Sequence, residues 1–183
     1  RMVGFLAEPV FMIVFFTVSF VANSTIPYIV QQRWVTPESR FFAPDHVLLL
    51  VAFVMLIIAE TGRIPVDNPS GHFELAMIDE SKVLEYSGRG AALMKWGGHM
   101  KLLVLMIVLV NVLVSPWGLA ADQSLESALL AIPLVGLKVL GFIVLLVIVE
   151  SSLAKLRLFR ISEFLGTALV ASVAAMVTRI FTY

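Results

Sequence analysis

Long apolar stretches dominate this sequence, and they limit the folds that it can adopt. They cover residues 5–22, 46–60, 99–117, 129–150 and 162–182. Several reach the roughly 20 residues with which a helix crosses a bilayer. Sixty per cent of all residues are hydrophobic and 14% are charged, a balance beyond what a soluble core requires. Because lipid offers the peptide groups no hydrogen-bond partners, such stretches must fold as helices. The sequence therefore predicts an all-α integral membrane protein, with one transmembrane domain of about five helices over residues 1–183.

The stretches differ in length and in their small and polar residues. The stretch at 46–60 is short, so we expect it to include flanking residues, to be tilted or to lie partly within the bundle. Asn111 is expected to hydrogen-bond to a neighbouring helix. Small residues in the last stretch predict close helix packing there. They are Gly166, Ala168, Ala171, Ser172, Ala174 and Ala175.

The longest connection, residues 61–98, is rich in charge, and Lys and Arg predict which side it faces. One face of the bundle would carry nine basic residues and the other face three. The nine are Arg1, Arg63, Lys82, Arg89, Lys95, Lys101, Lys155, Arg157 and Arg160, and the three are Arg33, Arg40 and Arg179. The richer face should be cytoplasmic. The loop at 61–98 is therefore predicted to be cytoplasmic, with a short helix at about 71–86 and a turn at 87–90.

Composition also excludes several functions. The formal net charge is zero, so the whole chain has no attraction for nucleic acid. The chain has no cysteine, which excludes disulfides and cysteine-ligated iron-sulfur clusters within it. No phosphate-binding glycine motif or nucleophile-base arrangement is visible. We therefore expect any redox centre to lie in a partner subunit.

Glu60 and Arg63 stand out because they place charge at the end of an apolar stretch. A carboxylate and a guanidinium three residues apart on a helix can hold each other ionised near hydrocarbon, at a cost that usually accompanies a function. From the residues alone, the pair fits two interpretations equally well. It is either a charge-handling site at the membrane surface or an ion pair that only caps the helix end.

Among the other charged residues of the apolar stretches, three are candidates for a role in charge transfer. Lys138 is roughly 13 Å from the nearer end of its stretch, which is too far for its ammonium to reach the interface, so it should face the bundle interior, water or a carboxylate. Glu150 either handles charge or pairs with Lys155 at the interface. For Glu8, stabilisation by a helix N-terminus and a place in a proton path are equally open.

The charged loop also carries a recognisable motif. Residues 59–67 read AETGRIPVD, and FEL follows at 73–75 and LEYSG at 84–88. This combination resembles the signature of the complex I subunit 1 family, which includes the membrane subunit of group 4 membrane-bound nickel-iron hydrogenases of the formate hydrogenlyase and hydrogenase-4 type. Weaker similarity extends over most of the chain and looks more like the hydrogenase branch. The matching residues are Glu60, Arg63, Pro65, Asp67, Glu74, Leu75, Glu85, Tyr86, Ser87 and Gly88.

The resemblance implies a role and assigns residues to it. The chain would be a membrane anchor and proton-transfer subunit that couples redox chemistry in peripheral subunits to ion movement. The proton-transfer residues would be Glu60, Arg63, Asp67, Glu74, Glu85, Glu8, Lys138 and Glu150. The contact with the peripheral arm would involve Asp79, Glu80, Tyr86 and Arg89.

The resemblance further implies a location and partners. The chain would lie in the prokaryotic cytoplasmic membrane and contain no catalytic centre or cofactor of its own. Its partners would be hydrogenase-like large and small subunits, an iron-sulfur subunit and antiporter-like membrane subunits. A nickel-iron centre and iron-sulfur clusters would be bound in those partners. Since members of this family carry further helices before the matching region, we expect N-terminal helices to be missing from this chain.

Two other functions stay open. The shared motif is compatible with the quinone-site subunit of complex I, although Ser70 and His72 stand where complex I members usually have carboxylates. The intramembrane charges are also compatible with a stand-alone ion transporter that uses Lys138. Metal content, inhibitor binding and activity of the isolated chain would separate these interpretations.

Overall fold

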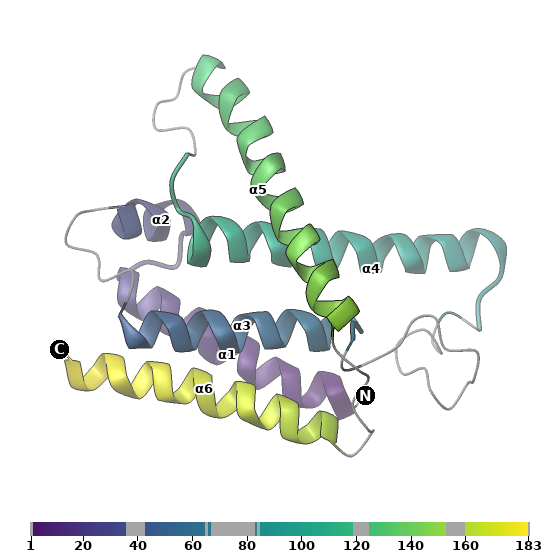
Figure 1. Cartoon of the computed structure of the whole chain (residues 1–183), viewed down its shortest axis with the longest axis horizontal. Coiled ribbons are helices and arrows are strands. Elements are labelled where there is room, and N and C mark those ends of the chain that lie inside the picture. The colour runs from purple at the N-terminus through teal and green to yellow at the C-terminus, as the bar shows by residue number, and fades with distance from the viewer. Residues whose placement is uncertain are drawn as a thin grey trace.

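The computed structural model is helical in every element that it describes. The described residues are 2–35, 43–64, 66, 83, 85–118, 125–152 and 160–182. The helices are α1 (Met2–Ala22), α2 (Pro27–Val35), α3 (Pro44–Glu60), α4 (Gly88–Val108), α5 (Leu125–Ser152) and α6 (Arg160–Thr182). A π-helical segment, η3 (Leu109–Val114), continues α4, so the two form one long rod (Figure 1).

The predicted membrane stretches correspond to α1, α3, α4 with η3, α5 and α6. Three helical segments are long and apolar enough to cross a membrane, namely Gly88–Val114, Leu125–Ser152 and Ile161–Phe181. A shorter apolar segment, Ala7–Phe20, lies in α1. The all-α membrane fold predicted from the sequence is therefore confirmed.

α3 is a central helix of the bundle. It packs most extensively against α6, and α1 packs against both (Figure 1). Leu49 and Phe53 of α3 are fully buried. Ala168, Ser172 and Ala175 of α6 are also fully buried, which confirms the close packing predicted from its small residues. With 17 residues, α3 is short, and its burial confirms that it lies within the bundle.

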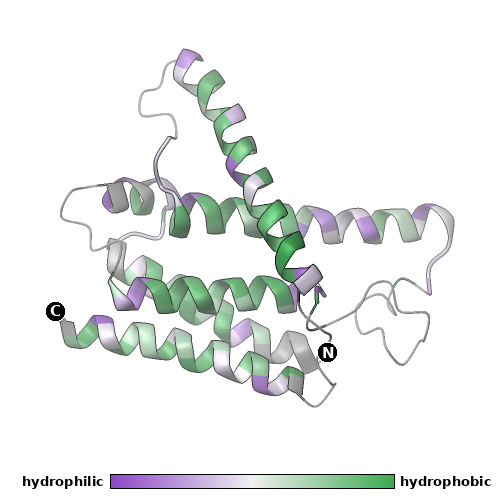
Figure 2. Cartoon of the chain, in the orientation of Figure 1, coloured by the Kyte–Doolittle hydropathy of each residue, from purple (hydrophilic) through white to green (hydrophobic). Residues whose placement is uncertain are grey.

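α5 has the opposite character. It crosses the other helices at a steep angle and is apolar along most of its length (Figures 1 and 2). Only Val139 and Leu146 are buried among its 28 residues. An apolar surface of this extent is stable only against lipid tails or other membrane helices. The exposed apolar side chains of α5 therefore face lipid or the helices of other membrane subunits.

α4 begins earlier than hydropathy predicts. The predicted stretch starts at residue 99, whereas the helix starts at Gly88. The predicted turn at 87–90 is wrong, because Ser87 is the N-cap and the following residues form the first helical turn. Basic residues lower the hydropathy of this segment without interrupting its helical hydrogen bonds, so hydropathy alone misses it.

Two local predictions need correction. Asn111 does not bond to a neighbouring helix; its Nδ2 donates to the Ile107 carbonyl of its own helix at 3.0 Å. α2 was not predicted, since the three prolines of the connection at about 23–45 suggest a loop. Pro27, however, is the first residue of the helix, where a missing N–H costs nothing. The predicted helix at about 71–86 falls almost entirely outside the described residues.

Candidate functional site

A Schellman motif ends α3 and decides where Arg63 points. Gly62 adopts φ +60, a left-handed conformation that favours glycine. Its N–H donates to the Ala59 carbonyl at 3.5 Å, and the Arg63 N–H donates to the Ile58 carbonyl at 3.1 Å. The chain therefore leaves the helical path directly after Glu60, and Arg63 is no longer in helical register with it.

Two ion pairs join three helices at this end of the bundle. The Glu60 carboxylate pairs with the Lys101 ammonium of α4, which also lies 3.4 Å from the Glu60 carbonyl oxygen. Arg63 Nη1 lies 3.4 Å from both carboxylate oxygens of Glu150 on α5. We call these four residues the charge cluster.

The pairing differs from the prediction. Glu60 and Arg63 pair with residues of other helices rather than with each other, because Gly62 ends the helical geometry that would place them one turn apart. Glu150 pairs with Arg63, and Lys155, its predicted partner, lies outside the described residues. Lys101 was missed as a site residue. Its signal was a basic residue at the start of the apolar part of α4.

The two carboxylates are more buried than their cations. The side chains of Glu60 and Glu150 are 19% and 18% exposed, whereas those of Lys101 and Arg63 are 50% and 29% exposed. Partial burial strengthens the attraction within each pair relative to water. The cations therefore form the outer side of the cluster, and the carboxylates form its inner side.

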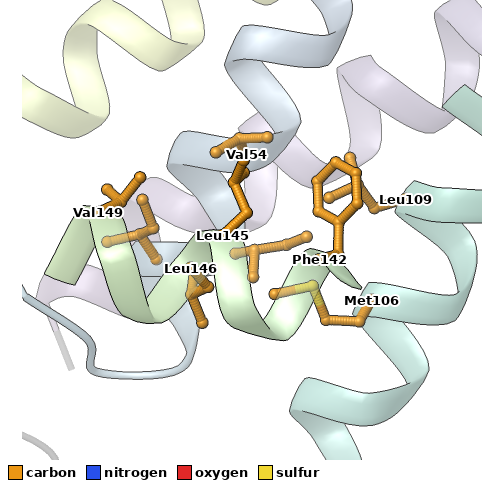
Figure 3. A pocket seen from close by; sticks show the side chains of 9 residues that line it. Val54, Met106, Leu109, Phe142, Leu145, Leu146 and Val149 are labelled. Atoms are coloured by element: carbon orange, nitrogen blue, oxygen red, sulfur yellow. The ribbon is translucent and has the colours of Figure 1, made fainter. Parts of the chain in front are cut away.

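An apolar groove lies beside the charge cluster, between α3, α4 with η3, and α5 (Figure 3). Its walls include Ile58 of α3, Met106 of α4 and Leu146 and Val149 of α5, and every lining side chain is apolar. Val149 directly precedes Glu150 in the chain. No side chain that lines the groove can donate or accept a proton.

Lys138 contacts backbone carbonyls rather than the groups predicted for it. Its Nζ donates to the Ser115 carbonyl at 3.0 Å and to the Trp117 carbonyl. Both carbonyls follow the C-terminal end of η3, where a helix leaves its last acceptors without intrahelical partners. The ammonium therefore ties α5 to the end of η3, with the helix dipole favouring its charge.

A second polar group lies at this same end of the bundle, opposite the charge cluster. Arg179 Nη1 of α6 lies 3.4 Å from an Asp45 carboxylate oxygen of α3, and both side chains are largely buried. The neighbouring His46 is buried, and its Nε2 lies 2.6 Å from the Leu113 carbonyl oxygen of η3. Sequence reasoning missed all three side chains. The sequence did contain an indication of the ion pair. Asp45 lies in the first turn of α3 and Arg179 in the last turn of α6, where the helix dipole stabilises the charge of each side chain.

The remaining predicted residues are not brought into the charge cluster. Glu8 is exposed on α1, and it lies beyond the first turn because the helix starts at Met2; the predicted stabilisation by a helix N-terminus is wrong. Glu85, Tyr86 and Arg89 are exposed just before and at the start of α4. Asp67, Glu74, Asp79 and Glu80 lie outside the described residues. Within the described part, no group of three or more His, Cys, Asp or Glu could hold a metal ion.

The sequence is similar to those of known proteins. Residues 2–180 match the protein family described as NADH dehydrogenase. The chain is 32% identical over 158 residues to formate hydrogenlyase subunit 4 of Escherichia coli (strain K12), covering 86% of this chain and 50% of that protein. It is 33% identical over 174 residues to hydrogenase-4 component C of the same organism, covering 92% of this chain and 52% of that protein. The chain thus spans about half the length of these relatives.

Proposed function

Because the chain belongs to the family described as NADH dehydrogenase, we propose that it is the membrane anchor and proton-transfer subunit of a hydrogenase-type redox complex related to complex I. The names of its two relatives, a formate hydrogenlyase subunit and a hydrogenase-4 component, support the hydrogenase branch. The three long apolar helices support the anchoring role.

The charge cluster is the observation that carries the proton-transfer role. It holds two carboxylates, Glu60 and Glu150, at one end of the bundle, and each faces a cation from another part of the chain. A carboxylate can take up and release a proton when its cation moves away, and the outer positions of Lys101 and Arg63 leave room for that movement. Asp67, Glu74 and Glu85 would extend this relay into the loop, and Glu8 and Lys138 would extend it into the membrane.

The redox chemistry would take place in partner subunits. These 183 residues include no cysteine, so they supply no thiolate ligand for a nickel-iron centre or for iron-sulfur clusters. Those partners would be hydrogenase-like large and small subunits and an iron-sulfur subunit, with antiporter-like subunits beside this chain in the membrane. Tyr86 and Arg89 are exposed near the start of α4, where a peripheral arm could reach them, and Asp79 and Glu80 would contribute from the loop.

The proposed location is the prokaryotic cytoplasmic membrane, with the charge cluster on the cytoplasmic side. The cluster lies where the loop at 61–98 begins, on the face to which nine of the 13 basic residues are assigned, and the face richer in basic residues is cytoplasmic. In this orientation the Asp45–Arg179 pair lies toward the opposite side. A peripheral arm in the cytoplasm would then dock directly over Glu60 and Glu150.

Metal analysis of the natively purified complex tests the assignment. We expect nickel and iron to copurify with this chain in fixed proportion. A complex without nickel that binds a quinone-site inhibitor tightly would instead identify the quinone-site subunit. Ion transport by the chain alone, after purification, would favour a stand-alone transporter.

The relay role is tested by Glu60→Gln. Glutamine keeps the shape of the side chain but cannot carry a proton. We expect redox-linked proton movement to fall while artificial electron acceptors are still reduced. The matched control is Glu126→Gln, which removes an exposed carboxylate from the first turn of α5 and should leave both activities unchanged. Normal proton movement in an assembled Glu60→Gln complex would exclude the relay role.

A further inference from the structure

The end of the rod formed by α4 and η3 has more backbone acceptors than donors. The Ser115 N–H closes the last turn on the Val110 carbonyl at 2.7 Å, so the carbonyls that follow Val110 in the last turn need other partners. Pro116 comes next and contributes no N–H. This end of the rod therefore has a surplus of carbonyl oxygens.

Side chains of two other helices contact these carbonyl oxygens. We call the carbonyls of Ser115 and Trp117, which both accept a hydrogen bond from Lys138 of α5, the carbonyl cluster. His46 of α3 lies 2.6 Å from the Leu113 carbonyl oxygen of the same rod end. A positive charge is therefore held here by neutral oxygens. Among the described residues, the ion pairs of the structure do not include Lys138.

Two further features belong to the same end of the rod. Asn111, one turn before Ser115, has a buried Oδ1 without a hydrogen-bond partner among the described residues, so another acceptor oxygen is present on the same helix end. Gly118 has φ +78, and a Cβ there would lie 3.7 Å from the Lys138 Nζ as well as against the Leu134 side chain. The backbone at Gly118 therefore lies close to the ammonium.

We infer that the carbonyl cluster is a binding site for a monovalent alkali cation, and that the Lys138 ammonium occupies it in this structure. An ammonium and an alkali ion carry the same charge, and both are bound by carbonyl oxygens at the broken ends of membrane helices. A divalent ion is disfavoured, because calcium and magnesium sites include carboxylates and no described carboxylate contacts Lys138. When Lys138 loses a proton to water, its amine becomes neutral, and one cation can enter for each proton released.

Replacement of the ammonium tests this inference without any redox assay, so its outcome is separate from that of the proposed function. Lys138→Met removes the charge and nearly keeps the length. Lys95→Met removes one charge from an exposed position of α4 and is the matched control. The thermal midpoint of the natively purified complex is measured in NaCl, KCl and choline chloride at equal ionic strength. We expect NaCl or KCl to raise the midpoint of Lys138→Met by several degrees above its value in choline chloride, and to leave the wild type and Lys95→Met at their choline values near pH 7.

A second measurement uses the wild-type complex and so does not depend on the folding of a variant. At alkaline pH, addition of NaCl or KCl should release protons from the wild type, detected with a pH-sensitive dye, and release should be absent in Lys138→Met. Equal midpoints of Lys138→Met in the alkali and choline salts would overturn the inference. A salt-specific rise of the same size in Lys95→Met would overturn it as well. Absence of proton release from the wild type would show that the lysine does not exchange for a cation.

Discussion

The pair between Arg63 and Glu150 gives the sharpest test of the charge cluster. Arg63→Gln leaves the largely buried Glu150 carboxylate without its cation, Glu150→Gln leaves the cation without its carboxylate, and the double substitution removes both charges. If the two residues act only as a pair, the double variant should be more stable than either single variant, because it leaves no unpaired charge behind. Stability and proton movement can then be compared in the same three variants.

The size of the effect follows from distance and exposure. Two unit charges 3.4 Å apart attract by about 1 kcal/mol in water and by about 5 kcal/mol at the effective dielectric constant near a protein surface. The side chains are 29% and 18% exposed, between an exposed pair, worth up to about 1 kcal/mol, and a broken buried pair, which costs about 3–5 kcal/mol. We therefore expect each single variant to lose about 2 kcal/mol, a drop in thermal midpoint of roughly 4–8 °C.

Thermal unfolding of the purified complex measures this cycle, and Glu126→Gln again serves as the control. We expect the double variant to regain most of the midpoint lost in either single variant, while proton movement stays low because Glu150 is absent. Additive losses in the double variant would refute the pairing. Full proton movement in the double variant would refute a relay role for Glu150 and leave the pair as a structural tie between α5 and the end of α3.

Three other predictions follow from the described geometry. Since the chain has no native cysteine, Ser87→Cys and Thr25→Cys each introduce a single site for labelling. A membrane-impermeant thiol reagent should reach Ser87→Cys from the cytoplasmic side and Thr25→Cys from the opposite side. Labelling of both variants from one side would contradict the topology. Gly62→Ala should lower the free energy of unfolding by about 1–2 kcal/mol because φ is +60 there. The control Gly97→Ala, in a helix with open space around it, should leave stability unchanged or raise it. Equal effects in thermal unfolding would contradict the Schellman motif. Ala168→Leu should cost about 1–3 kcal/mol in the same assay because the side chain would enter the contact between α6 and its neighbours, and an unchanged midpoint would contradict that packing.

The five long helices and their approximate positions could be read from the sequence, because both depend on local properties, whereas α2 was missed. An apolar stretch long enough for the bilayer must be helical wherever it packs, and the small residues of α6 already indicate a close contact. The helix end at Gly62 could also be read from the sequence, since a glycine just after an apolar stretch is the usual signal for a helix end. The start of α4 could not be read this way, because hydropathy measures solvent preference rather than helix length.

The charged residues of the candidate site were visible in the sequence, but their partners were decided by the tertiary structure. Lys101 is 41 residues from Glu60, Glu150 is 87 residues from Arg63, and Arg179 is 134 residues from Asp45. Local spacing suggests a pair between Glu60 and Arg63, yet the turn at Gly62 separates them, and the packing of α4 and α5 supplies closer partners. The same holds for Lys138. From the sequence, an ammonium in the middle of an apolar stretch must find a partner, whereas only the crossing of α5 over the end of η3 makes backbone carbonyls that partner.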